Sequence, residues 1–368
     1  MKAKLERKKN SIRNIEFGFL NKIITIIFPF IMRTALIYTM GSEYLGLSSL
    51  FSSILQVLSL SELGIGSAMV FELYRPIAEN DTKKICKLQN LYKKIYRTIG
   101  IVILALGICI LPFLGVFIKD GYPTDVNIYV LYVLYLLNSS ASYLLYAYKS
   151  TLLTAYQRRD IISNIGTVIH IILYIIQLVC LVNFHNYYTY VVWLPICTII
   201  ENIITAIYVK KIYPNCNPEG KLEREEIKSI VVRVRDLFGH KLSSVVTNSV
   251  DTIVISSFIG LNMVTIYNNY YYLMSAISGI LDIVYQGILA GIGNSLVAES
   301  IEKNKKDFDK FFFINAWIVR LVHNMFSMFI STNDRIVDGK RINAIFWLSN
   351  IIMYIFFYME NKTNCISL

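Results

Sequence analysis

Two cations lie within the first long apolar stretch of the chain, where a charged side chain is costly. Lys22 and Arg33 occur among Ile, Phe and Leu residues, and eleven positions separate them. At about 100° per residue, eleven positions make about three helical turns, so both side chains project from one helix face. A cation at bilayer depth costs about 2.5 to 3.5 kcal/mol and usually faces water, a partner or a substrate. The pair predicts a helix that lines a polar passage within a membrane.

Three carboxylates in other apolar segments are further candidates. Asp251 is interpreted either as the partner of Arg33 or as the carboxylate that couples transport to a proton or sodium ion, and Asp282 as a second coupling group or an inter-helix hydrogen bond. Glu62, near the end of its helix, is either a gate or half of a structural pair. The alternative for Arg33 is an ion pair with Glu43 or Glu62 that only fixes packing. Glu201 is interpreted as structural.

A tyrosine-rich segment at residues 267–272 reads Tyr-Asn-Asn-Tyr-Tyr-Tyr and includes Asn269 and Tyr270. Aromatic faces and amide groups suit carbohydrate, so these two residues are candidates for substrate binding. The chain has 26 tyrosines, however, and tyrosine also concentrates at membrane interfaces. His240 could titrate near neutral pH, but its place beside Lys241 is also typical of an interfacial histidine.

Composition predicts an all-α, polytopic membrane protein. The 368 residues are 55% hydrophobic, with a mean hydropathy of +0.51, which exceeds the usual content of soluble domains. The net charge of +11 could indicate nucleic acid, but the basic residues cluster in short segments between apolar runs, so we expect no nucleic-acid partner. The six cysteines have no metal-site or redox spacing and are interpreted as free thiols; no cofactor or metal is expected.

Ten apolar segments approach or exceed the length needed to cross a bilayer. Basic residues gather at alternate ends of these segments, which hold 28 of the 36 Lys and Arg, whereas the opposite ends, up to the ninth segment, have only Lys119. By the positive-inside rule the N-terminus is cytoplasmic, and the turns near Gly41, Asp120, Asn183 and Gly260 face outward. The first segment lacks a cleavage site and is interpreted as a retained helix. The predicted helices cover residues 15–40, 44–72, 96–118, 127–148, 161–183, 187–209, 238–260, 263–297, 309–330 and 343–358.

A weak internal repeat divides the chain. The sequence Gly-Ile-Gly at 64–66 recurs at 291–293, the turn at Gly41 corresponds to Gly260, and Lys22 and Arg33 correspond within one residue to His240 and Asp251. Such repeats favour two parallel six-helix bundles around a central cavity, with the substrate between them. The predicted domains are a bundle at 1–211, a cytoplasmic linker with an amphipathic helix at 212–237, and an incomplete second bundle at 238–368.

The first hairpin carries a family resemblance. Residues 38–47 read Tyr-Thr-Met-Gly-Ser-Glu-Tyr-Leu-Gly-Leu, and residues 58–68 read Leu-Ser-Leu-Ser-Glu-Leu-Gly-Ile-Gly-Ser-Ala. This pattern resembles the opening hairpin of bacterial polysaccharide flippases, the O-antigen and capsule exporters of the multidrug/oligosaccharidyl-lipid/polysaccharide superfamily. The similarity covers about residues 10 to 318.

The resemblance implies a V-shaped pair of helical bundles, with 12 to 14 helices, in the bacterial cytoplasmic membrane. It implies movement of an undecaprenyl-pyrophosphate-linked oligosaccharide from the inner to the outer leaflet, without covalent chemistry. Arg33 and Lys22 would then bind pyrophosphate or acidic sugar, because Arg offers a fork and Lys a point charge to phosphate oxygens. Membrane lipids, a proton or sodium ion and a polysaccharide polymerase are the further partners considered.

Two alternatives compete with this interpretation. A multidrug or organic-ion antiporter on the same fold should have an acidic cavity, whereas a membrane-embedded polymerase or acyltransferase should have a large outer loop or a clustered base and nucleophile. The chain also departs from the family pattern after Trp317-Ile318-Val319, because Arg335, Lys340 and Arg341 occupy an expected outward turn. We therefore expect residues 319–368 to come from a shifted frame or a decayed gene, which leaves the second bundle incomplete.

Overall fold

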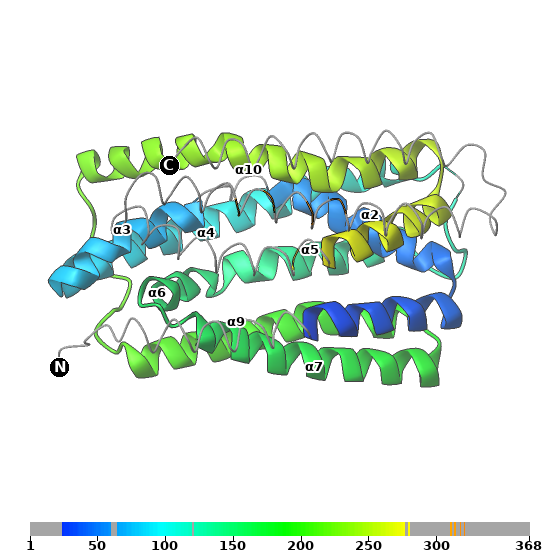
Figure 1. The fold of residues 1–368 in the computed structure, drawn as a ribbon, viewed down its shortest axis with the longest axis horizontal. Coiled ribbons are helices and arrows are strands. Elements are labelled where there is room, and N and C mark those ends of the chain that lie inside the picture. Colours follow the sequence, from blue (N-terminus) through cyan, green and yellow to red (C-terminus); the bar gives the residue numbers. More distant parts are fainter. Residues whose placement is uncertain are drawn as a thin grey trace. The chain divides into compact units, whose positions relative to one another are not determined.

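A computed structural model describes residues 24–59, 65–119 and 121–276, together with the single residues 279, 310, 313, 317 and 320; several side chains between 236 and 248 are left out. The chain divides into two compact units, Met1–Ser278 and Gly279–Leu368. The secondary structure elements that the structure describes in the first unit are all helices (Figure 1). The predicted fold class, an all-α polytopic membrane protein, is confirmed.

Long helices of the first unit run along the same direction and are joined by short turns (Figure 1). α10 packs along α2 and also contacts α3 and η2, α5 packs on α4 and α9, and α7 packs on α9. A first helix covers Ile24–Thr39, and a last one covers residues 261–276. The others are α2 (Ser42–Leu58), α3 (Ile65–Glu79), α4 (Thr82–Ile110), η2 (Leu111–Phe117), α5 (Ile128–Leu144), η3 (Ala147–Lys149), α6 (Ser150–Ala155), α7 (Arg159–Phe184), α8 (Tyr187–Val191), α9 (Trp193–Ile212) and α10 (Arg224–Phe258).

Three segments of the described chain are long and apolar enough to cross a membrane: Thr82–Phe117, Arg159–Phe184 and Tyr187–Ile212. A fourth crossing is formed if α5 and the 147–155 segment, which bend by 46° relative to each other, act as one. Much of the apolar surface is exposed rather than buried, as on α7, where Val168, Ile175 and Val182 are each at least half exposed. Such a surface is stable in lipid but not in water.

Helix boundaries differ from the predicted ones where a helix continues beyond its apolar part. α4 begins at Thr82 rather than near residue 96, because the Asp81 side chain accepts a hydrogen bond from the backbone N–H of Lys84 and caps the helix. α10 is one helix of 35 residues where an amphipathic helix and a separate membrane helix were expected. Its start is fixed by a reciprocal capping box between Glu223 and Glu226.

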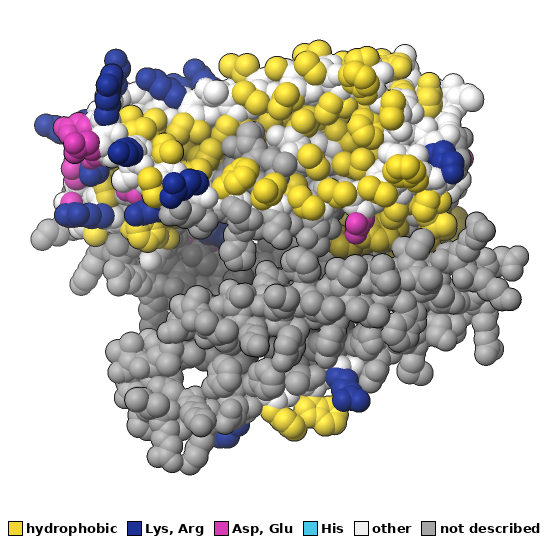
Figure 2. Space-filling view, turned by 90° about the horizontal axis from the view of Figure 1, so that it is seen from above, with side chains coloured by type: hydrophobic (Ala, Val, Ile, Leu, Met, Phe, Trp, Pro, Cys, Tyr) yellow, Lys and Arg dark blue, Asp and Glu magenta, His cyan; other side chains and the backbone are white. Residues whose placement is uncertain are grey.

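Basic residues and outward turns lie at opposite ends of the unit. Figure 2 shows Lys and Arg side chains gathered at one end, with hydrophobic side chains over the middle of the same face. At the other end, the four turns predicted to face outward are joined by hydrogen bonds. Tyr187 Oη donates to the Tyr44 carbonyl at 3.1 Å, and Lys119 Nζ donates to the Phe258 carbonyl at 2.6 Å. The segregation of charge is therefore confirmed for the described residues, and the orientation in the membrane stays a prediction.

At the basic end, α10 is held to α3 and α4 by ion pairs. Arg233 Nη1 lies 2.8 Å from Glu72 Oε1, and the guanidinium carbon lies 4.1 Å from the ring centroid of Phe71. Lys84 Nζ lies 2.9 Å from Glu226 Oε1, and this hydrogen bond lowers the pKa of the Glu226 carboxyl. These contacts fix the start of α10 against the α3–α4 hairpin.

Replacing Glu72 with Gln is expected to loosen this end of α10. The substitution keeps the shape but removes the charge opposite Arg233, and a partly exposed pair of this kind contributes about 1 kcal/mol at most. Protease cleavage after Lys221 should therefore become faster, by up to about fivefold. Glu79→Gln is the matched control, because its partner Arg75 is 85% exposed in side-chain area. Equal cleavage rates in both variants would contradict a structural role for the Glu72 pair.

Candidate functional site

The helix Ile24–Thr39 places Arg33 deep within the helical unit. Arg33 precedes the turn at Gly41 by eight positions, or about 12 Å along the helix axis. Gly41 has a φ of +112°, a backbone conformation that favours glycine, and this residue ends the helix before α2. Since half of a bilayer core measures about 15 Å, the predicted position of this turn at the outer surface would put Arg33 near the middle of the membrane.

The Arg33 guanidinium contacts the last helix, at residues 261–276. Its Nε donates a hydrogen bond to Asn269 Oδ1 at 3.1 Å, and its central carbon lies 5.3 Å from the ring centroid of Tyr272. The Nη2 nitrogen is buried and has no hydrogen-bond partner in the described part of the chain. A buried donor without a partner is costly, so this arrangement is suited to an anionic ligand that accepts from the guanidinium.

Tyr272 is positioned by a break in the hydrogen bonding of the first helix. Pro29 has no backbone N–H, so the Thr25 carbonyl lacks its usual helical partner four residues later. The single hydrogen of the Tyr272 hydroxyl is shared between the Thr25 carbonyl, at 3.4 Å, and the Ile26 carbonyl, which is closer. The ring is thereby held beside Arg33, where it stabilises the cation through its face.

Asp251 does not pair with Arg33 in this structure. Asp251 is exposed and accepts a hydrogen bond from the Tyr267 hydroxyl at 2.7 Å. The alternative partner Glu43 accepts from Asn262 Nδ2 at 3.4 Å, near the outer turn. Among the residues described, Arg33 is in no ion pair with a carboxylate. Within that part of the chain, no carboxylate therefore neutralises the cation.

The remaining candidates are less informative. Tyr270 is half-buried on the same helix as Asn269. Lys22, Glu62 and Asp282, and the side chain of His240, lie outside the described residues, so their roles stay predictions. Both Arg33 and Asn269 were predicted to bind substrate, and the structure places them in contact. The binding of Tyr272 to the first helix near Pro29 was not predicted from the sequence, although the proline was a visible signal of a break in hydrogen bonding.

Tyrosine hydroxyls continue the polar interior beyond Arg33. Tyr135 Oη lies 2.9 Å from Ser48 Oγ and 3.2 Å from Tyr187 Oη, and both tyrosines are buried. Tyr190 stacks on Tyr187 at 5.7 Å between ring centroids and is close enough to Arg33 to interact with it electrostatically. The interior next to Arg33 thus offers hydroxyl groups and ring faces, which suit both phosphate oxygens and sugar rings.

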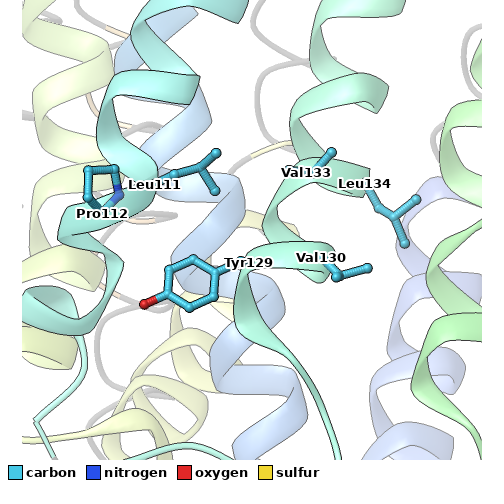
Figure 3. A pocket seen from close by; sticks show the side chains of 6 residues that line it. All are labelled: Leu111, Pro112, Tyr129, Val130, Val133 and Leu134. Carbon is cyan, nitrogen blue, oxygen red and sulfur yellow. The ribbon is translucent and has the colours of Figure 1, made fainter.

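One pocket of about 360 Å³ lies between η2 and the start of α5 (Figure 3). No ionisable carboxylate, imidazole or amine is among the described residues that line it, so it is chemically distinct from the Arg33 site. Its walls suit an apolar chain such as a lipid tail. The lining residues are Leu111, Pro112, Tyr129, Val130, Val133 and Leu134.

Within the described residues, no group of three or more His, Cys, Asp or Glu side chains could hold a metal ion. The cysteines that the structure describes are free, as expected: Cys86, Cys109, Cys180, Cys197 and Cys216. The described side chains of the site are a guanidinium, an amide and aromatic hydroxyls, groups that suit the binding and orientation of a ligand.

A family model described as polysaccharide biosynthesis protein matches residues 11–289. The chain belongs to this family. The matched segment includes the first helix and the helix at 261–276, so both sides of the Arg33 site are family sequence. No curated protein and no solved structure matches the chain significantly. Membership establishes a multi-pass membrane protein with a role in polysaccharide synthesis or export.

Proposed function

We propose that this protein moves an oligosaccharide linked to undecaprenyl pyrophosphate from the inner to the outer leaflet of a bacterial cytoplasmic membrane. The product would be a cell-surface polysaccharide such as O-antigen or capsule. The observation that carries the proposal is Arg33, a cation at membrane depth that binds an amide and a ring face but, among the described residues, no carboxylate. A lipid-linked diphosphate is an anion that must pass this depth, and a guanidinium binds two of its oxygens at once.

The mechanism needs binding and movement but no covalent step. Arg33 holds the diphosphate, while Asn269 and the tyrosine rings contact sugar. The lipid tail stays in the bilayer, and helices on either side of the site separate first at one membrane surface and then at the other. A cationic site argues against an organic-cation antiporter, which needs an acidic cavity. The proposal also includes Lys22 as a second cation that binds the substrate, and a proton or sodium ion that drives the cycle.

Deleting the gene tests the direction of movement. We expect lipid-linked repeat units to accumulate in the inner leaflet of the deletion strain, because the acceptor lipid is loaded there and cannot cross. A glycosidase added to intact spheroplasts should leave these units uncut, and the same enzyme added to inverted vesicles should cut them.

A complemented strain is the control and should show no accumulation on either side. Cleavage in intact spheroplasts of the deletion strain would mean that the units reach the outer leaflet without this protein. That result would favour a polymerase and reject the flippase proposal.

A further inference from the structure

A second ionisable pair lies within the membrane, away from Arg33, on α7 and α9. His170 Nε2 lies 4.0 Å from Glu201 Oε2, and the two side chains are 38% and 29% exposed. His170 is the twelfth of the 26 residues of α7, and Glu201 is the ninth of the 20 residues of α9. Both are therefore near the middle of helices that are long enough to cross the bilayer. Ionisable residues at this depth are rare and generally functional.

The helices are shaped to bring the two groups together. Gly166 precedes His170 by one helical turn and lies on the same face of α7. A Cβ atom at Gly166 would be 3.3 Å from Glu201 Oε1, so the absence of a side chain leaves space for the carboxylate. The 4.0 Å separation is too long for a direct hydrogen bond, and His170 Nδ1 is buried without a hydrogen-bond partner among the described residues. The imidazole thus lies beside the carboxylate while its buried Nδ1 atom makes no hydrogen bond within the described residues.

Polar side chains near this pair, on α5 and α9, form hydrogen bonds with one another. Thr198 Oγ1 donates to Asn138 Oδ1 at 2.7 Å, and Asn202 Nδ2 lies 3.3 Å from Ser142 Oγ. A sodium ion needs several oxygen ligands, whereas the pair itself offers only the carboxylate oxygens of Glu201. A carboxylate and an imidazole alone suit a proton, because together they are neutral with one shared proton and anionic without it.

Aromatic contacts connect this pair to the Arg33 site. The rings of His170 and Tyr174 have centroids 6.2 Å apart, and Tyr174 stacks on Phe28 of the first helix at 5.5 Å. Tyr174 also lies near Tyr272, the residue whose ring faces Arg33. These ring contacts connect the pair to the first and last helices of the unit over a short path.

We propose that His170 and Glu201 form a proton-binding site within the membrane, and that its occupancy sets the affinity of the Arg33 site for its anionic ligand. In the loaded state the pair holds one proton and is neutral. When that proton leaves to water, the pair becomes an anion. The negative charge then competes with an anionic ligand for Arg33, so proton release lowers ligand affinity, and by linkage ligand binding favours proton uptake.

Other titratable groups near α7 and α9 have different positions or roles. Cys197 lies on α9 one turn before Glu201, and Tyr174 is one turn after His170 on α7. On the described elements packed against these helices, the charged side chains lie toward the ends of their elements: Lys149, Arg158, Arg159, Asp160, Lys210 and Lys211. The other titratable groups there are one thiol and phenols, none of which is charged at neutral pH: Cys180, Tyr129, Tyr132, Tyr135, Tyr143, Tyr148, Tyr187, Tyr188, Tyr190 and Tyr208. Arg33 and Tyr272 belong to the Arg33 site.

The first test needs no transport activity. The full-length protein in lipid nanodiscs is titrated while the infrared carbonyl band of protonated carboxylic acids is recorded. We expect a band that disappears as pH rises and that is absent in Glu201→Gln. His170→Gln should keep the band but shift its midpoint, because the imidazole that shares the proton with Glu201 is removed. Glu225→Gln, which changes an exposed carboxylate at the start of α10, should leave the band unchanged. A band unaffected by both Glu201→Gln and His170→Gln would overturn the proposal.

The second test rests on the proposed function. A failure of the proposed function can be told apart from a failure of the proton site, because the infrared titration requires no transport. Proteoliposomes holding a lipid-linked oligosaccharide are assayed at several pH values. One linked proton changes ligand affinity by up to about tenfold per pH unit, and we expect this dependence in the wild type and in Asp251→Asn but not in Glu201→Gln. Loss of the dependence only in Asp251→Asn, or a requirement for sodium, would overturn the assignment of the coupling role to this pair.

Discussion

Replacing Arg33 with alanine is expected to lower the export of surface polysaccharide by at least tenfold. In the proposed function the guanidinium supplies hydrogen bonds to a charged ligand, and each such bond contributes about 1.5 to 3 kcal/mol. Losing one of them lowers affinity by at least about a factor of ten. Arg33→Lys should have an intermediate effect, because it keeps the charge but loses the Nε donor that orients the group on Asn269. Export is measured as surface polymer per cell at equal protein abundance.

Two further variants separate a cationic role from a packing role. Asn269→Asp places a carboxylate where the amide now accepts from Arg33 at 3.1 Å, which preserves the contact but neutralises the site. Export should fall in this variant while the protein remains folded. Arg75→Ala removes an exposed cation and should have no effect. Full export by Arg33→Ala, or by Asn269→Asp, would reject a role for this cation in ligand binding.

Gly46→Ala is expected to lower the stability of the protein by about 2 kcal/mol or more. A Cβ atom at this position of α2 would lie 2.3 Å from the Leu261 carbonyl oxygen, a backbone atom that no side-chain rotation can move. Alanine favours a helix over glycine by about 1 kcal/mol, but overpacking of this severity costs more. The two helices must separate, which also weakens the hydrogen bond from Thr265 Oγ1 to the Ser42 carbonyl at 2.6 Å. Thermal unfolding of the purified protein measures the effect.

Gly115→Ala is the matched control for this prediction. A Cβ atom at Gly115 meets no atom within 4 Å, so the same chemical change there should leave the unfolding midpoint unaltered. If Gly46→Ala were as stable as this control, the close approach of α2 to residue 261 could not be a feature of the folded protein. A fall in midpoint for both variants would instead point to a general effect of lost glycine.

The sequence predicted the helices well where apolar residues define them, and less well where they do not. Hydropathy cannot detect the first four turns of α4, which carry Lys83, Lys84 and Lys87, but Asp81 is a recognisable N-cap residue before them. The predicted boundary between an amphipathic helix and the following membrane helix was wrong for a similar reason. No proline interrupts residues 224–258, so hydrogen bonding continues although the polarity changes.

The candidate site was predicted only in part, because its contacts join residues more than 200 positions apart. The cost of burying a cation identified Arg33, and the tyrosine-rich segment identified Asn269. The choice between Asn269 and Asp251 as the partner of Arg33 depends on how the helix at 261–276 is rotated and how closely it approaches, which periodicity does not specify. His170 was not singled out, since a single histidine in an apolar segment acquires meaning only when Glu201 is seen beside it.

The continuity of α10 has a mechanical consequence. At about 1.5 Å per residue, its 35 residues make a rod of about 52 Å, longer than the hydrocarbon layer is thick. It is fastened at one end by Arg233 to Glu72 and at the other by Ser256, whose hydroxyl donates to the Phe117 carbonyl at 2.6 Å. If one of these two contacts breaks, a stiff helix rotates as a unit about the contact that remains. In the proposed transport cycle, such a rotation would open the site at one membrane surface and close it at the other, so that the bilayer keeps its barrier throughout.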